Sequence, residues 1–430
     1  MQPVGQGKRL MDHRAAGGGK GVALVRPWGE SLVTAGKKSY YTSRHIGNDY
    51  FDRTARQGGM IMKRTWLARF LAGGLLLACL GAAPARGEGT FRIGYLQGGD
   101  YHTYRQLFSS VMEELERVGW ADRLEFPADA CFSADWDRDR CREMAHELAS
   151  RTDLDMIWAF GTWAGQEMIK TSNTTTPIVV MSVSNAVRSG IVPSTEDSGR
   201  DNLTTRIDPT KYERQVRLFY DVFRFKKLGV VYADTPTGRT YAALDMLKEL
   251  SKELGFSLVT YSKVPENQED AAEEIVKGVR EIAPGIDAYY MTICIGFELS
   301  NVPEVMEILN RHKIPCMSMY GADYVKAGAL MTIADSRYQQ RARFTVAKLI
   351  RILEGEKPRD LPIVFAPGPR LAVNLAAARK IGWDPSIDIL ASADHVYNEI
   401  RSLERIAEEA KSDYGTLTVW DLCGKSAGKP

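Results

Sequence analysis

The sequence predicts an α/β protein with two doubly wound lobes, each built on a parallel β-sheet. From Phe91 onward, short apolar runs rich in Val, Ile and Tyr alternate with longer segments of helical period, which is typical of βαβ units. Of the 430 residues, the 345 that follow Ala85 are enough for two lobes of ordinary domain size. Each lobe can then bury a hydrophobic core of its own.

Eight short apolar runs are predicted strands because they are rich in β-branched and aromatic residues. In chain order they are FRIGYL (91–96), DMIWAF (155–160), PIVVMSV (177–183), KLGVVYA (227–233), SLVTYSKV (257–264), DAYYMTI (287–293), IPCMSMY (314–320) and ALMTIAD (329–335). Apolar residues recur at helical spacing over 107–118 and 244–254, which predicts helices that cover the sheet faces. A long amphipathic helix is predicted from Ala393 to Ala407.

The segment from Met62 to Gly89 has the pattern of a complete export signal. Three basic residues flank an apolar run from Phe70 to Leu80, and Ala83-Pro84-Ala85 supplies a small-x-small cleavage pattern. The apolar run is shorter than the roughly 20 residues that span a bilayer. We therefore interpret 62–85 as a cleaved signal peptide and expect the protein in the periplasm.

Residues 1–61 are Gly-rich and basic, without a sustained apolar period, and we interpret them as an untranslated or disordered leader before a start at Met62. An alternative for the signal itself remains open. Leu76-Leu77-Ala78-Cys79 resembles a lipobox, in which acylated Cys79 would tether the protein to a membrane.

Export changes the charge of the chain. Cleavage after Ala85 removes 13 of the 56 basic and 4 of the 54 acidic residues and leaves a net charge of −7. No Lys/Arg cluster interleaved with aromatic residues remains, which argues against nucleic acid as a partner.

Five cysteines remain after Ala85, so at least one thiol is free or bonds between chains. Cys131 and Cys141 bracket a short polar segment, and in an oxidising compartment we expect them to form a disulfide. Cys294 and Cys316 lie in apolar runs and are expected to be buried. No cysteine has the spacing of a zinc site, and we expect no metal and no cofactor.

The candidate binding residues follow the predicted strands, because parallel sheets bind ligands at the carboxyl ends of their strands. The turns found there are rich in Gly, hydroxyl and aromatic residues, which suit a small polar or zwitterionic ligand. They contain Tyr101, Gly161-Thr162, Ser184-Asn185, Asp234-Thr235, Phe297, Tyr320 and Asp323. For any one of these residues taken alone, helix capping is a slightly better explanation than ligand contact.

Several stretches, in order, resemble a known family. They include Ile157 to Thr162, Thr176 to Val179, Ala186 to Val192, Asn202 to Thr204, Leu228 to Tyr232, Gly355 to Pro358 and Val373 to Ala378. The family is that of the type I periplasmic solute-binding proteins of ABC importers, in the group that includes the tryptophan-uptake binding protein. The likeness runs from about Phe91 to Tyr397.

The resemblance implies a clamshell with a three-crossing hinge. It implies an N-lobe of 90–207 plus 328–358, a C-lobe of 208–327 plus 359–382, and a C-terminal helix and tail over 383–430. The ligand would lie between the lobes. Candidate contacts implied by the matching turns are Tyr101, Gly161, Thr162, Ser184, Asn185, Tyr232, Asp234 and Asp323.

The sequence departs from the family pattern after two strands. Asn185-Ala186 stands where the family often has Asp-Pro, and Ile293 to Phe297 stands where it often has a polar turn that contains Asp. A potential partner for a ligand ammonium is therefore missing, so the tryptophan specificity is not transferred to this chain.

We expect a monomeric, extracytoplasmic binding protein that captures an amino acid or related small carboxylate and delivers it to an ABC importer permease. Contact with the membrane is expected only through the permease or a lipid at Cys79. The alternative is an exported sensory module that presents its bound solute to a membrane receptor. An enzyme is disfavoured, because no G-x-S-x-G, H-E-x-x-H or Walker motif accompanies the histidines.

Overall fold

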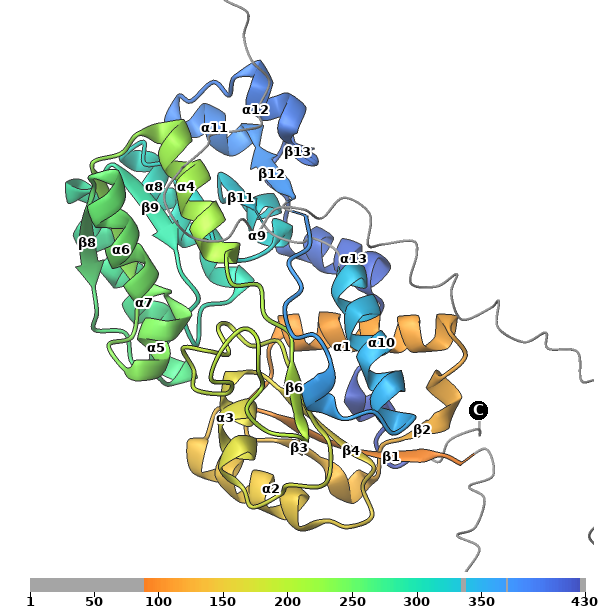
Figure 1. Cartoon of the computed structure of the whole chain (residues 1–430). Helices are drawn as coiled ribbons and strands as arrows, with labels where there is room; N and C mark the ends of the chain where they lie inside the picture. The colour runs from red at the N-terminus through yellow and green to blue at the C-terminus, as the bar shows by residue number, and fades with distance from the viewer. Residues whose placement is uncertain (1–88, 334–337, 369, 426–430) are drawn as a thin grey trace, which may run out of the picture. The chain divides into compact units, whose positions relative to one another are not determined.

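Two mostly parallel β-sheets organise residues 89–333, 338–368 and 370–425, which are the residues that the computed structural model describes (Figure 1). All of them belong to one unit, 83–430. The predicted leader, the signal peptide and Cys79 lie outside the described residues. None of the described helices is both long enough and apolar enough to cross a bilayer.

The first sheet is parallel throughout, in the order β2-β1-β4-β5-β6, with β3 also paired with β1. Its strands are β1 (Phe91–Gln97), β2 (Leu124–Glu125), β3 (Cys131–Ser133), β4 (Met156–Phe160), β5 (Ile178–Met181) and β6 (Leu203–Thr205). Strands β1, β4 and β5 confirm the first three predicted runs. The two- and three-residue strands β2, β3 and β6 are too short to give a recognisable pattern.

The second sheet has the order β13-β12-β11-β10-β9-β7-β8, and only the β11–β12 pair is antiparallel. Its strands are β7 (Lys227–Val231), β8 (Ser257–Tyr261), β9 (Ala288–Met291), β10 (Cys316–Ser318), β11 (Met331–Ile333), β12 (Leu371–Asn374) and β13 (His395–Tyr397). Strands β7 to β11 confirm the remaining predicted runs. The two sheets confirm the predicted fold class.

Helices cover both faces of each sheet. They are α1 (His102–Arg117), α2 (Arg138–Ser150), α3 (Thr162–Lys170), α4 (Lys211–Phe223), α5 (Pro236–Tyr241), α6 (Leu244–Leu254), α7 (Gln268–Ile282), α8 (Val302–Arg311), α9 (Ala322–Lys326), α10 (Gln339–Leu353), α11 (Leu375–Ile381), α12 (Ile387–Ser392) and α13 (Leu403–Tyr414). Each sheet carries one apolar core on each face. We call the first sheet with α1, α2, α3 and α10 the first lobe, and the second sheet with its helices the second lobe.

The chain passes between the lobes at three places, the number of crossings that the resemblance implies. These lie between β6 and α4, between β11 and α10, and between residue 360 and β12. Two of the crossings pair with each other, because Ile207 N–H donates to Ile363 O at 2.7 Å and Phe365 N–H donates to Ile207 O at 2.9 Å. These paired crossings form part of the hinge.

Strand β11 corrects the expected lobe boundary. The interpretation of 328–358 as first lobe is wrong for 331–333, because Met331 pairs with Met317 of β10 and with Val373 of β12. The second sheet also extends beyond residue 382 through β13. The run 329–335 was recognisable as a strand, but the partner of a strand is set by contacts distant in sequence.

The C-terminal segment also differs from the prediction. Residues 395–397 form β13 rather than the first turn of a long helix, and the helix α13 starts only at Leu403. Ile406 of α13 is buried in a core of the second lobe, whereas Val419 is buried in a core of the first lobe. The segment therefore makes a fourth connection between the lobes.

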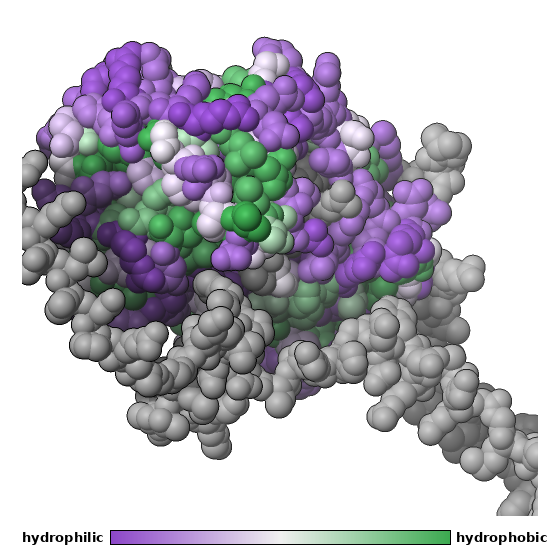
Figure 2. Space-filling model, turned by 90° about the horizontal axis from the view of Figure 1, so that it is seen from above, coloured by the Kyte–Doolittle hydropathy of each residue, from purple (hydrophilic) through white to green (hydrophobic). Residues whose placement is uncertain are grey.

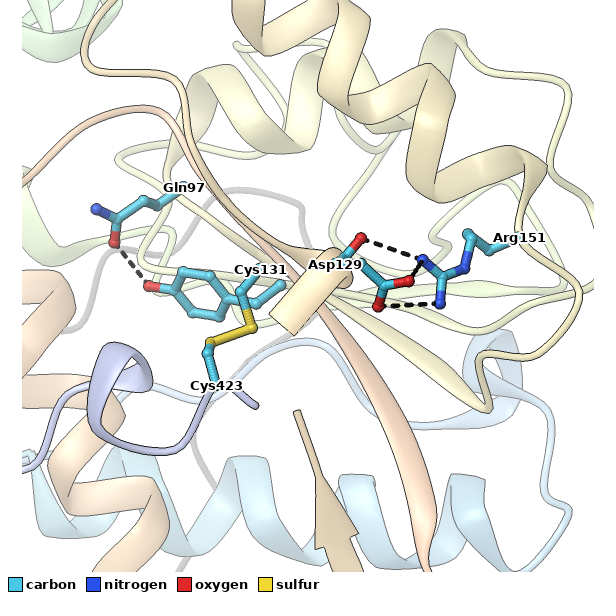
Figure 3. Close-up of a disulfide and its surroundings, with 6 residues drawn as sticks. Gln97, Asp129, Cys131, Arg151 and Cys423 are labelled. Atoms are coloured by element: carbon cyan, nitrogen blue, oxygen red, sulfur yellow. Dashed lines mark hydrogen bonds and ion pairs between the residues drawn. A yellow bond between two sulfur atoms is a disulfide. The ribbon is translucent and has the colours of Figure 1, made fainter. Parts of the chain in front are cut away.

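The predicted disulfide between Cys131 and Cys141 is wrong. Cys131 at the start of β3 is bonded to Cys423, whereas Cys141 is a free, buried thiol in α2 (Figure 3). Cys141 faces the apolar side of its helix together with Ala145 and Leu148. The tail reaches Cys131 because α13 brings it back to the first lobe, which spacing along the chain does not reveal.

The surface of the described part is mixed in polarity. Figure 2 looks down on the end where α11 and α12 lie and shows hydrophobic residues between larger hydrophilic areas. The large hydrophobic side chains that the described residues expose are those of Val364, Ile387, Val396 and Trp420. Trp420 is 46% exposed and lies edge-on to Tyr95 in the first lobe.

Candidate functional site

A cavity of about 130 Å³ is lined by residues of both lobes at the carboxyl ends of their strands. In the first lobe the lining residues include the segments after β1, β4, β5 and β6. In the second lobe they include the segments after β9 and β10. A cavity volume of about 10–15 Å³ is enough for one enclosed water molecule. This cavity therefore has room for a ligand of roughly ten heavy atoms. Its place between two α/β sheets agrees with the rule that predicted the candidate residues.

Four of the predicted residues line this cavity. They are Tyr101 after β1, Thr162 at the start of α3, Ser184 after β5 and Tyr320 after β10. They come from four separate turns, and the parallel sheets bring them together. The remaining predicted residues lie elsewhere and have other partners.

Gly161 does not line the cavity, but it allows Tyr104 to do so. Its φ is +95°, and a Cβ at this position would lie 2.0 Å from the Tyr104 hydroxyl. A side chain at 161 would therefore displace Tyr104 from the wall. Desolvation raises the pKa of the Tyr104 hydroxyl well above its usual value, so this group stays protonated.

Phenols of the second lobe meet hydroxyls of the first lobe at the cavity. Tyr212 of α4 lines the cavity together with Ser184, and Tyr241 of α5 lines it together with Thr162. Desolvation raises the pKa of the half-buried Tyr212 to about 12, against the opposing effects of Arg341 and Ser184. Both phenols are therefore neutral, and they can donate or accept a hydrogen bond.

Tyr320 holds the wall of the second lobe in place. Its hydroxyl accepts a hydrogen bond from Cys294 N–H at 3.1 Å, and its ring stacks on Tyr324 with centroids 4.1 Å apart. Phe297 is only 2% exposed and packs against both rings instead of facing the cavity. The turn after β9 is thus fixed by aromatic packing, with Ile293 to Gly296 at the cavity surface.

Asn185, Asp234 and Thr235 make local contacts instead of lining the cavity. Asn185 Oδ1 accepts from Arg188 N–H at 3.0 Å within its turn. Thr235 Oγ1 accepts from Gly238 N–H at 2.9 Å and caps α5. Asp234 pairs with Arg239 at 2.6 Å, and both side chains are about half exposed. These contacts correspond to the capping explanation of the same turns.

Tyr232 and Asp323 also lie outside the cavity lining. Tyr232 is 8% exposed and belongs to a core of the second lobe. Asp323, in the first turn of α9, pairs with Lys326 at 2.9 Å and accepts from Gln106 of α1 at 3.4 Å. Asp323 thus contacts the opposite lobe rather than the cavity.

Trp136 lines the cavity and was not predicted. It follows β3 and has a positive φ of 62°, and its backbone N–H donates to Gly98 O at 2.8 Å. A Cβ at Gly99 would lie 2.4 Å from the indole, so this packing needs glycine at 99. The only sequence signal was an aromatic residue in a polar loop.

A cationic set of side chains, Arg206, Lys211, Arg341 and Lys348, also lines the cavity and was not predicted. Arg206 and Lys211 lie at the first crossing, whereas Arg341 and Lys348 lie about two turns apart on the same face of α10. The described lining also contains two carboxylates, Asp208 and Glu298. Asp208 lies 3.0 Å from Arg214 and 4.0 Å from Arg206, and Glu298 lies 3.7 Å from His102. The described residues contain no His, Cys, Asp or Glu cluster suited to a metal ion.

A family model described as ABC transporter substrate binding protein matches residues 129–397, well over half of the chain. The chain belongs to this family. That result confirms the resemblance stated from the sequence. None of the curated proteins matches the chain significantly by sequence.

Solved structures similar to this substrate-binding family member share its fold. A conserved domain protein from Vibrio cholerae has a TM-score of 0.60 at 22% identity, covering 71% of this chain and 99% of its own. An ABC domain in complex with L-Trp from Streptococcus pneumonia has a TM-score of 0.58 at 19% identity, with coverages of 71% and 99%. A ligand-free, open substrate-binding protein with adhesive properties from Clostridium difficile has a TM-score of 0.54 at 21% identity, with coverages of 72% and 100%.

Proposed function

We propose that the chain captures an amino acid or a related small carboxylate between its lobes and delivers it to an ABC importer permease. The single observation that carries this proposal is the cavity lined by both lobes in a member of a substrate-binding family. A ligand that contacts both walls favours the closed arrangement of the lobes. Closure then changes the surface offered to a permease.

The chemistry of the cavity supports this ligand class. Aromatic side chains, among them Tyr101, Tyr104 and Trp136, offer an apolar or π surface for the body of the ligand. Hydroxyls and the cationic set offer donors to a carboxylate. One structural relative is described with bound L-Trp, which has both parts.

The proposal includes export and binding without catalysis. We propose a periplasmic monomer, released by cleavage after Ala85 or tethered through Cys79, whose other contacts are the solute and the permease. Membership of a substrate-binding family supports a binding role over an enzymatic one. No role for a cofactor or metal is proposed.

The first test is a thermal-shift screen of the purified chain against amino acids, small carboxylates, nucleosides, sugars and vitamins. A ligand at about 100 times its Kd adds about 2.7 kcal/mol to the native state, which raises Tm by several degrees. A hit among amino acids or carboxylates supports the proposal. A hit only among sugars or nucleosides contradicts the ligand class.

A matched pair of tryptophan variants tests whether the hit occupies the cavity. We expect Trp136→Ala to weaken binding of the hit about tenfold or more, because the indole lines the cavity. Trp420→Ala is the control, since Trp420 is half exposed and lies outside the lining. Equal loss in both variants, or none in Trp136→Ala, would place the binding site elsewhere.

Delivery is tested with a candidate ABC importer permease reconstituted in vesicles. The liganded chain is expected to stimulate the ATPase activity and to support uptake of the ligand. Binding without either response would favour the sensory alternative, in which a membrane receptor reads the closed form.

A further inference from the structure

We infer that Lys348 forms an acid-binding subsite of the cavity and that the anionic group of the ligand binds directly to its ammonium group. This inference deepens the proposed function, because it names the residue that recognises the acid. The expected ligand chemistry at this end of the cavity is a carboxylate.

Lys348 is a charged side chain in an almost fully buried position. It lies in the middle of α10, is 3% exposed, and reaches the end of β6 at the cavity wall. Its Nζ donates to Thr205 O at 2.6 Å and to Thr204 Oγ1 at 3.1 Å. The ring of Phe344 lies 4.8 Å from Nζ.

The hydrogen bonds of Lys348 leave one donor available. An ammonium group carries three N–H bonds, and the two threonine acceptors use two of them. No carboxylate of the described residues lies within ion-pair distance of Nζ, so both partners are neutral. A buried cation without a counter-ion is unfavourable, and an anion in the cavity would supply the missing charge and accept the third hydrogen bond.

The surroundings make this charge sensitive to pH. Burial, with a smaller contribution from the nearby Arg206 guanidinium, lowers the pKa of Lys348 to about 7. Other ionisable groups that line the cavity near α10, β6 and α4 are Asp208, Lys211, Tyr212, Tyr338 and Arg341. Binding of an anion favours the protonated amine, so the protein is expected to take up a proton when an acid binds near neutral pH.

The test uses two probes of one shape, 3-phenylpropanoate and 3-phenylpropanamide, which differ in charge. Binding to the purified chain is measured by calorimetry at pH 6 and pH 8. We expect the acid to bind more tightly than the amide. With a pKa of about 7 in the free protein, the acid should bind about tenfold more weakly at pH 8 than at pH 6.

Lys348→Met keeps the length of the side chain and removes its charge. We expect this variant to bind the acid about 10- to 100-fold more weakly at pH 6 and to lose the pH dependence, with binding of the amide unchanged. Arg343→Met is the control, because it removes one positive charge from an exposed position on the same helix. It should behave like the wild type.

A purely structural role for Lys348 would leave the preference for the acid and the pH profile intact in Lys348→Met. Equal binding of acid and amide, a flat pH profile in the wild type, or no binding of either probe would overturn the inference. The proposed function fails separately, when the wider solute screen finds no ligand at all.

Discussion

Lys348 illustrates how one residue can reduce stability in order to serve a site. A Lys amine prefers to be charged in water, but inside the wall of the cavity it has only neutral acceptors. Burial therefore brings its pKa down to about 7, more than three pH units below that of an exposed lysine. Proton binding at this position weakens the folded state.

We predict that, in the absence of ligand, the free energies of unfolding of the wild type and of Lys348→Met differ by an amount that depends on pH. Below pH 7 the amine is protonated in both the folded and the unfolded chain, and burying the charged amine then destabilises the folded chain to the full extent. Between pH 7 and pH 9 the Lys348 amine loses its proton in the folded chain but keeps it in the unfolded chain. The free energy of unfolding of the wild type should therefore rise by about 2 kcal/mol relative to that of the variant.

Urea unfolding of both chains at pH 7, 8 and 9 measures this difference. Parallel stability curves would contradict the prediction, because they would mean that the pKa of Lys348 is the same in the folded and unfolded chains. Arg343→Met again serves as the control, and its free energy of unfolding should change with pH in the same way as that of the wild type.

At the scale of elements, the C-terminal segment acts as a strap across the lobes. The helix α13 joins the second lobe through Lys326 of α9, whose Nζ lies 3.2 Å from Glu409. Beyond α13, Val419 enters a core of the first lobe and Cys423 bonds to Cys131 (Figure 3). One end of the strap is therefore held by charge and packing, and the other end by a covalent bond.

We predict that Cys423→Ser lowers the free energy of unfolding by about 2–4 kcal/mol, because the bond joins residues 292 positions apart and restricts the unfolded chain. Cys131→Ser should lower the free energy of unfolding by the same amount. The double variant should lower it by no more than either single variant. Urea unfolding under non-reducing conditions is the measurement.

Cys141→Ala provides the control for the disulfide. Cys141 is free and buried, so its loss should leave the bond intact, and peptide mapping should still recover Cys131 joined to Cys423. Recovery of a Cys131–Cys141 peptide, or an unchanged stability of Cys423→Ser, would contradict the observed pairing.

At the scale of the whole molecule, a few polar contacts join the lobes beside the cavity. Gln106 of α1 donates to Asp323 of α9 at 3.4 Å, and His102 Nδ1 lies 3.7 Å from Glu298. Neither Gln106 nor Asp323 lines the cavity. The Gln106–Asp323 contact can therefore affect the lobe arrangement without touching the ligand.

We predict that Gln106→Ala weakens ligand binding by up to about fivefold, since losing a hydrogen bond worth about 1 kcal/mol lowers the population of the closed form. Calorimetry with the ligand from the screen measures the change. Gln340→Ala, an exposed glutamine on α10, is the control. An unchanged Kd in Gln106→Ala would mean that this contact does not favour closure.

Features that depend on neighbouring residues could be predicted from the sequence. Runs such as 156–160 and 228–231 are strands because consecutive apolar residues favour extended chain buried on both faces. The positions of these apolar runs also predicted which turns follow strands. Tyr101, Thr162, Ser184 and Tyr320 line the cavity because the carboxyl ends of parallel strands share one edge.

Which distant segments meet could not be predicted from the sequence and is seen in the folded chain. The partners of β11, the bond between Cys131 and Cys423, and the position of Trp136 at a positive φ all depend on long-range contacts. Lys348 is the sharpest case, since its sequence neighbours are those of an ordinary amphipathic helix. Its burial against β6, 143 residues earlier in the chain, is what makes a surface-type residue a candidate acid-binding group.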